Sequence, residues 1–239
     1  MTPDKIIDLQ NGLYTAFIDQ TYRSNLAYRP QFVYNDNKKG QKVFSAIEEE
    51  LLKCDKFDIS VAFITKGGIT PLLQTLKELE RKHITGRILT TDYLNFSDPS
   101  ALDTLAGLSN IELRMYQTEK AGNGFHTKGY IFQKYEEYHF IIGSSNLTQD
   151  ALTRNMEWNT KVISINKGEM AQLVLHEFDR LWDVMRILSR NTAESMKNRN
   201  FSKRWFQSRN RSSDKRWFHL WKRILYSRIL CRELLFIIY

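Results

Sequence analysis

Short β-prone runs alternate with segments of helical spacing in the first half of the chain, and this alternation limits the available folds most. The runs lie at 57–64, 87–91 and 111–116 and are rich in Ile, Val, Leu and Phe. Apolar residues recur at helical spacing over 69–79, and a short helix is expected after the polar break at 95–99. Strands that alternate with helices predict a largely parallel sheet with helices on its faces.

The second half of the sequence predicts strands joined by a shorter connection. Residues 126–132 and 138–142 form two strand-like runs, and the five residues between them suit a β-hairpin. A further strand is expected at 157–165. Amphipathic helices are predicted at 6–19, 41–54 and 167–187. The expected fold class is therefore α/β, a mixed and largely parallel sheet flanked by helices, forming one domain over residues 1–187.

Residues 188–239 differ in composition from this domain. From Arg186 to the end, 14 Lys and Arg residues stand against 3 Asp and Glu, a net charge of +11; because the whole chain carries +8, residues 1–185 carry −3. The tail shows no sustained period and repeats Arg-Trp-Phe at 204–206 and 216–218. It is either a basic, aromatic arm that grips nucleic acid or a membrane surface, or a disordered or non-native segment. We favour the second interpretation.

Composition also narrows the environment and the chemistry. Cys54 and Cys231 lie far apart, which suggests neither a disulfide framework nor a zinc site and fits a reducing cytoplasm. The charged start of the chain does not resemble a secretory leader, and no apolar run is long enough to predict a membrane partner. No cluster of Asp, Glu and His has metal-ligand spacing, so neither a metal nor another cofactor is predicted. The P-loop pattern is absent, so ATP hydrolysis by this chain is not expected.

One pair of segments carries residues suited to phosphoryl transfer. His126 and Lys128 stand two apart on a predicted strand, so their side chains should share a face. The next strand returns to Gly-Ser-Ser-Asn at 143–146, and the hairpin would place Asn146 beside them. An imidazole can attack phosphorus while an ammonium and a carboxamide donate to the non-bridging oxygens. Ser144 and Ser145 are candidate substrate-binding residues.

Each segment alone also has an ordinary structural explanation. A His-x-Lys pattern is common on strands, and the residues at 143–148 could form a turn in which Asn146 or Thr148 caps a helix. Gly143 would let substrate or a symmetry mate approach the backbone closely. The order of the two segments, one strand-length apart, favours a catalytic site over two unrelated structural features.

The two segments together resemble the signature of the phospholipase D superfamily: His126-x-Lys128 followed by Gly143-Ser144-x-Asn146. The flanking residues 86–96 and 125–132 resemble the phospholipase D-like module at the N-terminus of bacterial DEAD/DEAH-box helicases, which is similar to metal-independent restriction endonucleases. The resemblance covers about residues 5–185. It implies a phospholipase D-like α/β sandwich whose site needs no metal ion.

The resemblance implies further features of the site. In those endonucleases a glutamate about eleven residues beyond the motif asparagine lines the site, and Glu157 stands at that distance; its other reading is a polar residue that begins a strand. The superfamily pattern has an aspartate five residues after the lysine, where this chain has Gln133. One motif supplies one histidine, but the chemistry needs a second to protonate the leaving oxygen. A two-fold homodimer in which the two copies of His126 meet would provide it.

We therefore expect a metal-independent DNA phosphodiesterase with a phosphohistidine intermediate and a dimer-interface site. It would be the nuclease module of a helicase-linked repair or restriction and defence system, with the helicase as partner or missing domain. The alternative is a catalytically inactive domain that binds nucleic-acid backbone or dimerises its host, which Gln133 and the acidic body support. A lipid phosphodiesterase is a weaker third reading, because nothing apolar is expected to flank the site.

Overall fold

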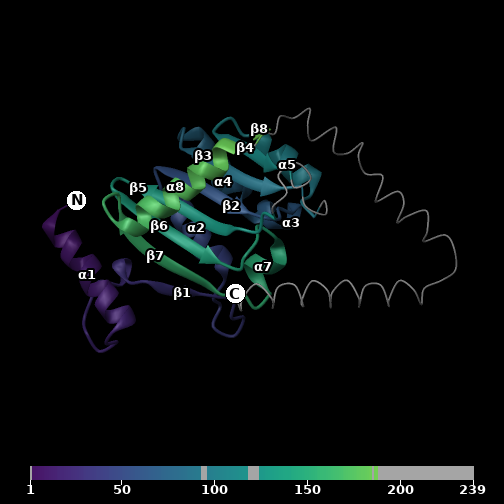
Figure 1. The fold of residues 1–239 in the computed structure, drawn as a ribbon. Helices are drawn as coiled ribbons and strands as arrows, with labels where there is room; N and C mark the ends of the chain where they lie inside the picture. The colour runs from purple at the N-terminus through teal and green to yellow at the C-terminus, as the bar shows by residue number, and fades with distance from the viewer. Residues whose placement is uncertain (1, 93–95, 118–123, 185, 188–239) are drawn as a thin grey trace, which may run out of the picture. The chain divides into compact units, whose positions relative to one another are not determined.

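The computed structural model describes residues 2–92, 96–117, 124–184 and 186–187. Within these ranges the chain forms one eight-stranded sheet in the order β1-β7-β6-β5-β2-β3-β4-β8, with helices on its faces (Figure 1). The tail predicted at 188–239 lies outside the described residues, so its two interpretations stay predictions.

The elements largely agree with the predicted pattern and add two short strands, β1 and β8; the helix predicted at 167–187 ends at Val184, and β8 takes up its last two positions. The strands are β1 (Gln31–Val33), β2 (Lys56–Val61), β3 (Thr85–Thr91), β4 (Ile111–Tyr116), β5 (Lys128–Lys134), β6 (Glu137–Gly143), β7 (Asn159–Ile165) and β8 (Arg186–Ile187). The α-helices are α1 (Pro3–Phe17), α2 (Val43–Lys53), α3 (Lys66–Ile69), α4 (Leu73–Arg81), α5 (Pro99–Ala106), α7 (Gln149–Thr153) and α8 (Glu169–Val184), with 3-10 turns η1 (Leu26–Tyr28) and η2 (Thr70–Leu72).

The sheet is mixed, as expected, and the α/β class is confirmed. Parallel pairing is less extensive than predicted: β2 pairs in parallel with β3, and β3 with β4. The other five strand pairs in the described part of the chain are antiparallel. One reason is the β5–β6 connection, which contains only Tyr135 and Glu136. A connection this short makes a hairpin and cannot make a parallel crossover.

The sheet has a buried layer on each face. On one face, Ile131 of β5 and Phe140 of β6 pack with Phe178 and Trp182 of α8. On the other face, Tyr130 of β5 is fully buried. Figure 1 shows α8 across the near side of the sheet and α2 with α4 on the far side. Alternation along β5 therefore supplies both layers from one strand.

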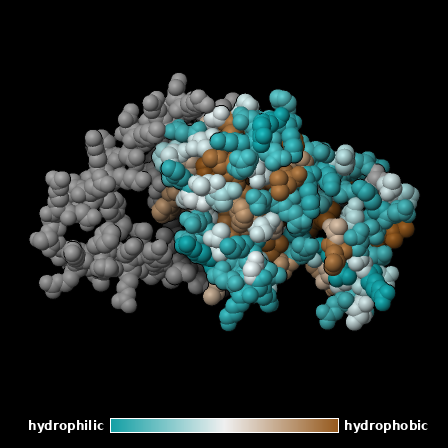
Figure 2. Space-filling model, turned by 180° about the vertical axis from the view of Figure 1, so that it is seen from behind, coloured by the Kyte–Doolittle hydropathy of each residue, from teal (hydrophilic) through white to brown (hydrophobic). Residues whose placement is uncertain are grey.

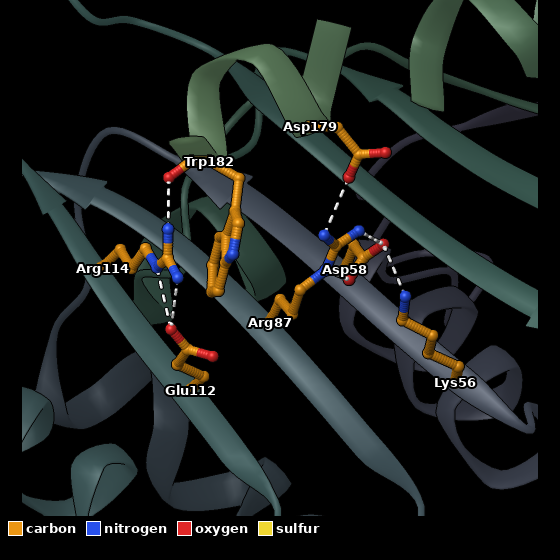
Figure 3. A network of polar contacts seen from close by, with 7 residues as sticks. All are labelled: Lys56, Asp58, Arg87, Glu112, Arg114, Asp179 and Trp182. Atoms are coloured by element: carbon orange, nitrogen blue, oxygen red, sulfur yellow. Dashed lines mark hydrogen bonds and ion pairs between the residues drawn. The ribbon is translucent and has the colours of Figure 1, made fainter. Parts of the chain in front are cut away.

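Two arginines attach α8 to the sheet (Figure 3). Arg87 of β3 forms two hydrogen bonds with the Asp58 carboxylate of β2, both 2.7 Å, and a third with Asp179 of α8 at 2.8 Å. The bonds to Asp58 outweigh partial burial and raise the pKa of Arg87 above its ordinary value. Arg114 of β4 lies 4.2 Å from the Trp182 ring centroid and donates to the Trp182 carbonyl at 2.7 Å. Charge and stacking thus hold α8 in place.

The N-terminal helix α1 is joined to the sheet by polar contacts. Lys5 Nζ lies 2.8 Å from Glu137 Oε1, and the Tyr28 hydroxyl donates to the same oxygen at 3.1 Å. Several apolar side chains of α1 and the residue after it stay exposed: Ile6, Ile7, Leu13, Phe17 and Ile18. Figure 2 shows hydrophobic patches on an otherwise mainly hydrophilic rear face. None of the helices in the described ranges is both long and apolar enough to cross a membrane.

Candidate active site

The predicted site residues meet at one edge of the sheet, where four strand ends come together. β2 ends at Val61, which pairs with Lys128 at the start of β5. β6 ends at Gly143, which pairs with Asn159 at the start of β7. Because β5 and β6 are neighbours, the segments beyond these ends lie at the same edge. The fold therefore brings together His126, Lys128, Ser144, Ser145, Asn146 and Glu157.

His126 and Lys128 are in direct contact. Lys128 Nζ lies 2.7 Å from His126 Nδ1 and 3.0 Å from Nε2. His126 is exposed and precedes β5, whereas the sequence predicted it on the strand. The ladder begins only at Lys128 because its β2 partner, Val61, is the last residue of that strand. A hydrogen bond between the hydroxyls of Ser60 and Thr127 fixes the segment between His126 and Lys128.

Asn146 is held by the segment that follows β2. The Phe63 amide donates to Asn146 Oδ1 at 3.1 Å, and the Leu147 amide donates to the Phe63 carbonyl at 3.1 Å. Since Oδ1 accepts a backbone N–H, the amide group Nδ2 is the end of this side chain that can donate to an anion. The helix-cap reading belongs instead to Thr148, whose side chain accepts from the Ala151 amide at the start of α7.

Ser144 and Glu157 form a linked pair beside the strand ends. Ser144 Oγ donates to Glu157 Oε2 and accepts from the Trp158 amide at 3.0 Å. The Ser144 amide in turn donates to the Trp158 carbonyl at 3.0 Å. The Glu157 carboxylate is half-buried, and these bonds hold it beside Ser144, two residues before Asn146. Glu157 is thus bonded to Ser144 at this edge, two residues before β7 begins, and its role in the site stays a prediction.

Ser145 is not placed to bind substrate, contrary to the sequence-based expectation. It is fully buried, and its Oγ accepts from Asn159 Nδ2 at 2.9 Å. Its carbonyl accepts from the Tyr130 hydroxyl at 3.0 Å. Consecutive residues leaving a strand point in opposite directions, so one serine faces the edge and the next faces the core. Gly143 also has a packing role: a Cβ there would lie 2.2 Å from the Trp158 carbonyl oxygen, so the glycine accommodates the neighbouring strand.

Gln133 lies at the other end of β5 from the site. It pairs with Lys56, the first residue of β2, and its Nε2 donates to the Tyr135 carbonyl at 3.3 Å. Gln133 lies five residue steps along the strand from Lys128, a distance of about 17 Å. The departure from the superfamily pattern at this position therefore removes no group from the edge where His126 and Lys128 lie.

Aromatic side chains flank the site on both sides, which the sequence reasoning missed. The Phe63 ring lies 6.2 Å from the His126 ring and 5.1 Å from the Phe96 ring, between centroids. On the other side, Trp158 is 72% exposed and its ring lies 5.6 Å from Phe32. The expectation that nothing apolar flanks the site was wrong. Trp158 follows Glu157 directly and could have been noticed, but nothing local associates Phe32 with this region.

The donors at this edge suit an anion better than a cation. They include an imidazole, an ammonium and a carboxamide, and the Glu157 carboxylate is bonded to a serine. Across the described ranges, no group of three or more His, Cys, Asp and Glu side chains is arranged to hold a metal ion. The arrangement can accept a phosphodiester, whose non-bridging oxygens need hydrogen-bond donors.

A family model described as the PLD-like domain of cardiolipin synthase matches residues 49–182, a range that includes every candidate site residue. The chain belongs to the phospholipase D-like family. No curated protein matches it. The helicase-module resemblance inferred from the flanking segments is more specific than this family and stays a prediction.

Solved structures share the fold of this phospholipase D-like chain. Nuc from Salmonella typhimurium, a phospholipase D family member, is 17% identical with a TM-score of 0.51, over 67% of this chain and 99% of Nuc. NucT from Helicobacter pylori is 14% identical with a TM-score of 0.54, over 67% of this chain and 99% of NucT. Phosphatidylserine synthase from Haemophilus influenzae is 15% identical with a TM-score of 0.52, over 66% of this chain and 40% of the synthase.

Proposed function

We propose that this chain is a metal-independent phosphodiesterase that cleaves DNA through a phosphohistidine intermediate, at a site shared by two copies of the chain. The contact of Lys128 with the His126 ring, at a sheet edge that also presents Asn146, carries the proposal. We assign the nucleophile to His126. Lys128 Nζ and Asn146 Nδ2 donate to the non-bridging oxygens, whose negative charge grows in the transition state.

The reaction proceeds in two displacements. In the first, a His126 ring nitrogen forms a bond to phosphorus and the P–O bond to the leaving strand breaks. His126 of the second copy gives a proton to that leaving oxygen. In the second, water attacks phosphorus, the second histidine takes its proton, and the P–N bond breaks. Both histidines return to their starting states, so the cycle needs no other reactant.

We assign supporting roles to Ser144 and Glu157. Ser144 bonds both the carboxylate and the Trp158 amide, so it ties the segment leading to Asn146 to the start of β7. That connection holds the Asn146 donor at the edge. The biological setting that fits the flanking-segment resemblance is a cytoplasmic nuclease module of a DNA repair or restriction system, with a helicase supplied by another domain or protein.

The test is purified protein on labelled DNA with excess chelator, wild type beside His126→Ala. We expect the wild type to cleave at the same rate with and without EDTA and to yield an acid-labile protein–DNA adduct after rapid quenching. His126→Ala should yield neither product nor adduct. The proposal fails if cleavage stops with chelator and returns with magnesium, or if His126→Ala cleaves at the wild-type rate.

The second candidate is a catalytically inactive domain that binds nucleic-acid backbone or dimerises its host. Two features supported it in the sequence, Gln133 and the net charge of −3 over residues 1–185. The first support is weak, because Gln133 lies at the far end of β5 from Lys128. The acidic body still favours it. A folded dimer that cleaves no DNA, RNA or simple diester would favour this candidate.

A further inference from the structure

A row of four residues crosses the sheet next to the reactive edge. Gly129 of β5 pairs with Ile142 of β6, Ile142 with Thr160 of β7, and Thr160 with Phe32 of β1. Directly paired residues project to the same face of a sheet. Ile142, Thr160 and Phe32 are exposed, and a Cβ on Gly129 would meet no atom within 4 Å. The row is therefore open to solvent.

Helix α8 covers the adjoining row but stops short of this one. Two residues further from the edge along the same strands, Ile131, Phe140 and Val162 belong to the core cluster beneath α8. The step of two keeps these residues on the same face as the open row. The face thus changes from core to open surface within one pleat, at the edge of the sheet where His126 and Lys128 lie; by the same alternation Lys128 begins on the opposite face, the face of Tyr130.

Trp158 and Phe32 form the aromatic end of this surface. Their rings lie 5.6 Å apart at 74°, and the Tyr34 ring lies 5.4 Å from Phe32. Trp158 is 72% and Phe32 is 55% exposed. The Trp158 backbone is bonded on both sides to Ser144, so this pair of rings, here called the aromatic platform, is fixed to the active-site edge. Large exposed aromatic rings next to a reactive site favour a ligand with flat, apolar faces.

The spacing between platform and reactive residues suits a nucleic-acid strand. Two strand spacings separate β5 from β7 and three separate β5 from β1, which is about 10 and 14 Å. Bases in a stacked strand rise about 3.4 Å per nucleotide. A strand that runs along this edge from His126 would therefore bring the base about three or four nucleotides away level with β7 and β1, the strands beside Trp158 and Phe32.

Positive charge lies beyond the platform. The segment after β1 carries three exposed lysines, Lys38, Lys39 and Lys42. This segment is anchored by Asn35, whose Nδ2 donates to the Asn155 carbonyl at 2.8 Å, two residues before Glu157. A lysine-bearing segment beside exposed rings is the combination that single-strand binding surfaces use, with cations for the phosphates and rings for the bases.

We propose that the aromatic platform stacks unpaired bases, so that the substrate class of this site is single-stranded nucleic acid. This inference rests on the proposed function and specifies its substrate. Stacking requires the flat face of a base, which a duplex hides between neighbouring base pairs and a single strand exposes. The contribution is sequence-tolerant, because every base has such a face.

The experiment measures binding separately from cleavage. In a His126→Ala background, labelled oligonucleotides of one sequence are titrated as single strand and as duplex, with EDTA present. We expect the single strand to bind more tightly, and Trp158→Ala to weaken that binding by about tenfold. Phe32→Ala should weaken it in the same direction. Met156→Ala is the matched control, because Met156 is 97% exposed two residues from Trp158 and has no ring.

Single abasic positions locate the contact. Removing the base three or four nucleotides from the cleaved bond should weaken binding to protein that retains Trp158, and should have little further effect in Trp158→Ala. Trp158→Phe, which keeps a ring, should restore most of the affinity. The coupling between an abasic position and one side chain is a readout that a general loss of stability would not produce.

Four results would overturn the role proposed for the platform. Equal affinity for single strand and duplex, or a Trp158→Ala variant that binds like Met156→Ala, would show that the rings do not stack bases. A dimer that dissociates in Trp158→Ala would assign them to a subunit interface. Binding to anionic phospholipid vesicles in preference to oligonucleotides would assign them to lipid. If binding depends on Trp158 but the wild type cleaves nothing, the proposed function is wrong and the platform stands. If the wild type cleaves but binding does not depend on Trp158, the platform is wrong and the proposed function stands.

Discussion

At the scale of the residue, the candidate site depends on side chains whose orientation is fixed by the backbone of other segments. Asn146 shows this clearly: its Oδ1 accepts the Phe63 amide, which fixes Nδ2 as the donor end of the side chain. Ser144 and Ser145 are adjacent but have different environments. Ser144 is bonded to Glu157 at the edge, whereas Ser145 is buried against Asn159. Function at this site should therefore be sensitive to single atoms.

Lys128→Ala and Asn146→Ala should each slow cleavage by about two to three orders of magnitude, the usual cost of deleting one preorganised donor to a developing oxyanion. Single-turnover rates at saturating DNA would measure this, with the melting temperature as a check on folding. Gln133→Ala is the matched control on the same strand, because Gln133 lies at the opposite end of β5 and should leave the rate unchanged. Equal losses in Gln133→Ala and Lys128→Ala would contradict a site confined to this edge.

Ser145→Ala and Ser144→Ala should give different phenotypes although the residues are adjacent. Removing Ser145 Oγ takes a hydrogen-bond acceptor from Asn159 in the core, at a cost of about 1–3 kcal/mol in the free energy of unfolding. Ser144→Ala should change that free energy less and the cleavage rate more, because it releases Glu157 and the segment before Asn146. Urea denaturation and single-turnover kinetics on both variants test this. A Ser145→Ala protein of wild-type stability would show that the buried bond is not needed.

At the scale of the element, the helices are joined to the sheet by charged groups as well as by apolar packing. On one face Arg87 connects β2 and α8; on the other, Glu50 of α2 contacts His139 of β6 at 2.8 Å and Lys161 of β7. Buried charges of this kind contribute little net stability when they are paired, but removing one partner is costly. Both attachments therefore predict strong single-site effects.

Arg87→Ala should lower the free energy of unfolding by about 3–5 kcal/mol, since it leaves the buried Asp58 carboxylate without its main partner. Arg180→Ala is the matched control on α8. Arg180 pairs with Glu177, and both side chains are more than half exposed, so its loss should cost far less than the loss of Arg87. Urea titrations of the two variants compare them directly. Similar losses in both would mean that α8 is held by its apolar face alone.

Stability should also depend on pH through Glu50. Burial acts to raise the pKa of this carboxyl, but hydrogen bonds and charge from His139 and Lys161 outweigh it and lower the pKa from 4.5 to about 2. A lowered folded-state pKa means that the stabilisation is complete above the unfolded value and is lost as the pH falls from about 5 to 2. The loss should be roughly 3 kcal/mol. Urea denaturation between pH 7 and 2.5 should show this slope, and Glu50→Gln should flatten it; an equal slope in both proteins would assign it to other carboxylates.

At the scale of the whole molecule, the proposed chemistry needs two histidines and the chain has one motif. His126 is exposed at the sheet edge, so a second copy can present its own His126 to the same phosphodiester. Activity should then belong to the dimer and not to the isolated chain.

Mixing an excess of His126→Ala chains with wild type and allowing subunits to exchange should suppress activity beyond simple dilution. The reason is that one histidine cannot serve as nucleophile and as leaving-group acid in the same step. Residual activity should follow the square of the wild-type fraction, and unmixed proteins combined just before the assay provide the control. Linear dilution after proven exchange, or full activity from a demonstrated monomer, would remove the two-fold site.

The sequence by itself determined the features that depend on neighbours along the chain. Periodicity gave the alternation of strands and helices, and the short connection between β5 and β6 gave a hairpin, which the register confirms. Because the motif segments flank that hairpin, the proximity of His126, Lys128 and Asn146 could also be predicted. Local chemistry and a period of two are enough for such features.

Only the tertiary structure decided what depends on contacts between distant segments. The three residues of β1 pair with β7 about 130 positions later in the chain, and no local sequence pattern predicts so short a strand. The same pairing brings Phe32 to Trp158 and creates the aromatic platform. Likewise, β5 lies beside β2, so the segment after β2 can bond to Asn146. The burial of Ser145 in the core is also a tertiary result. These outcomes follow from which strands share backbone hydrogen bonds, and that choice is made by packing of the whole sheet and not by any single run of residues.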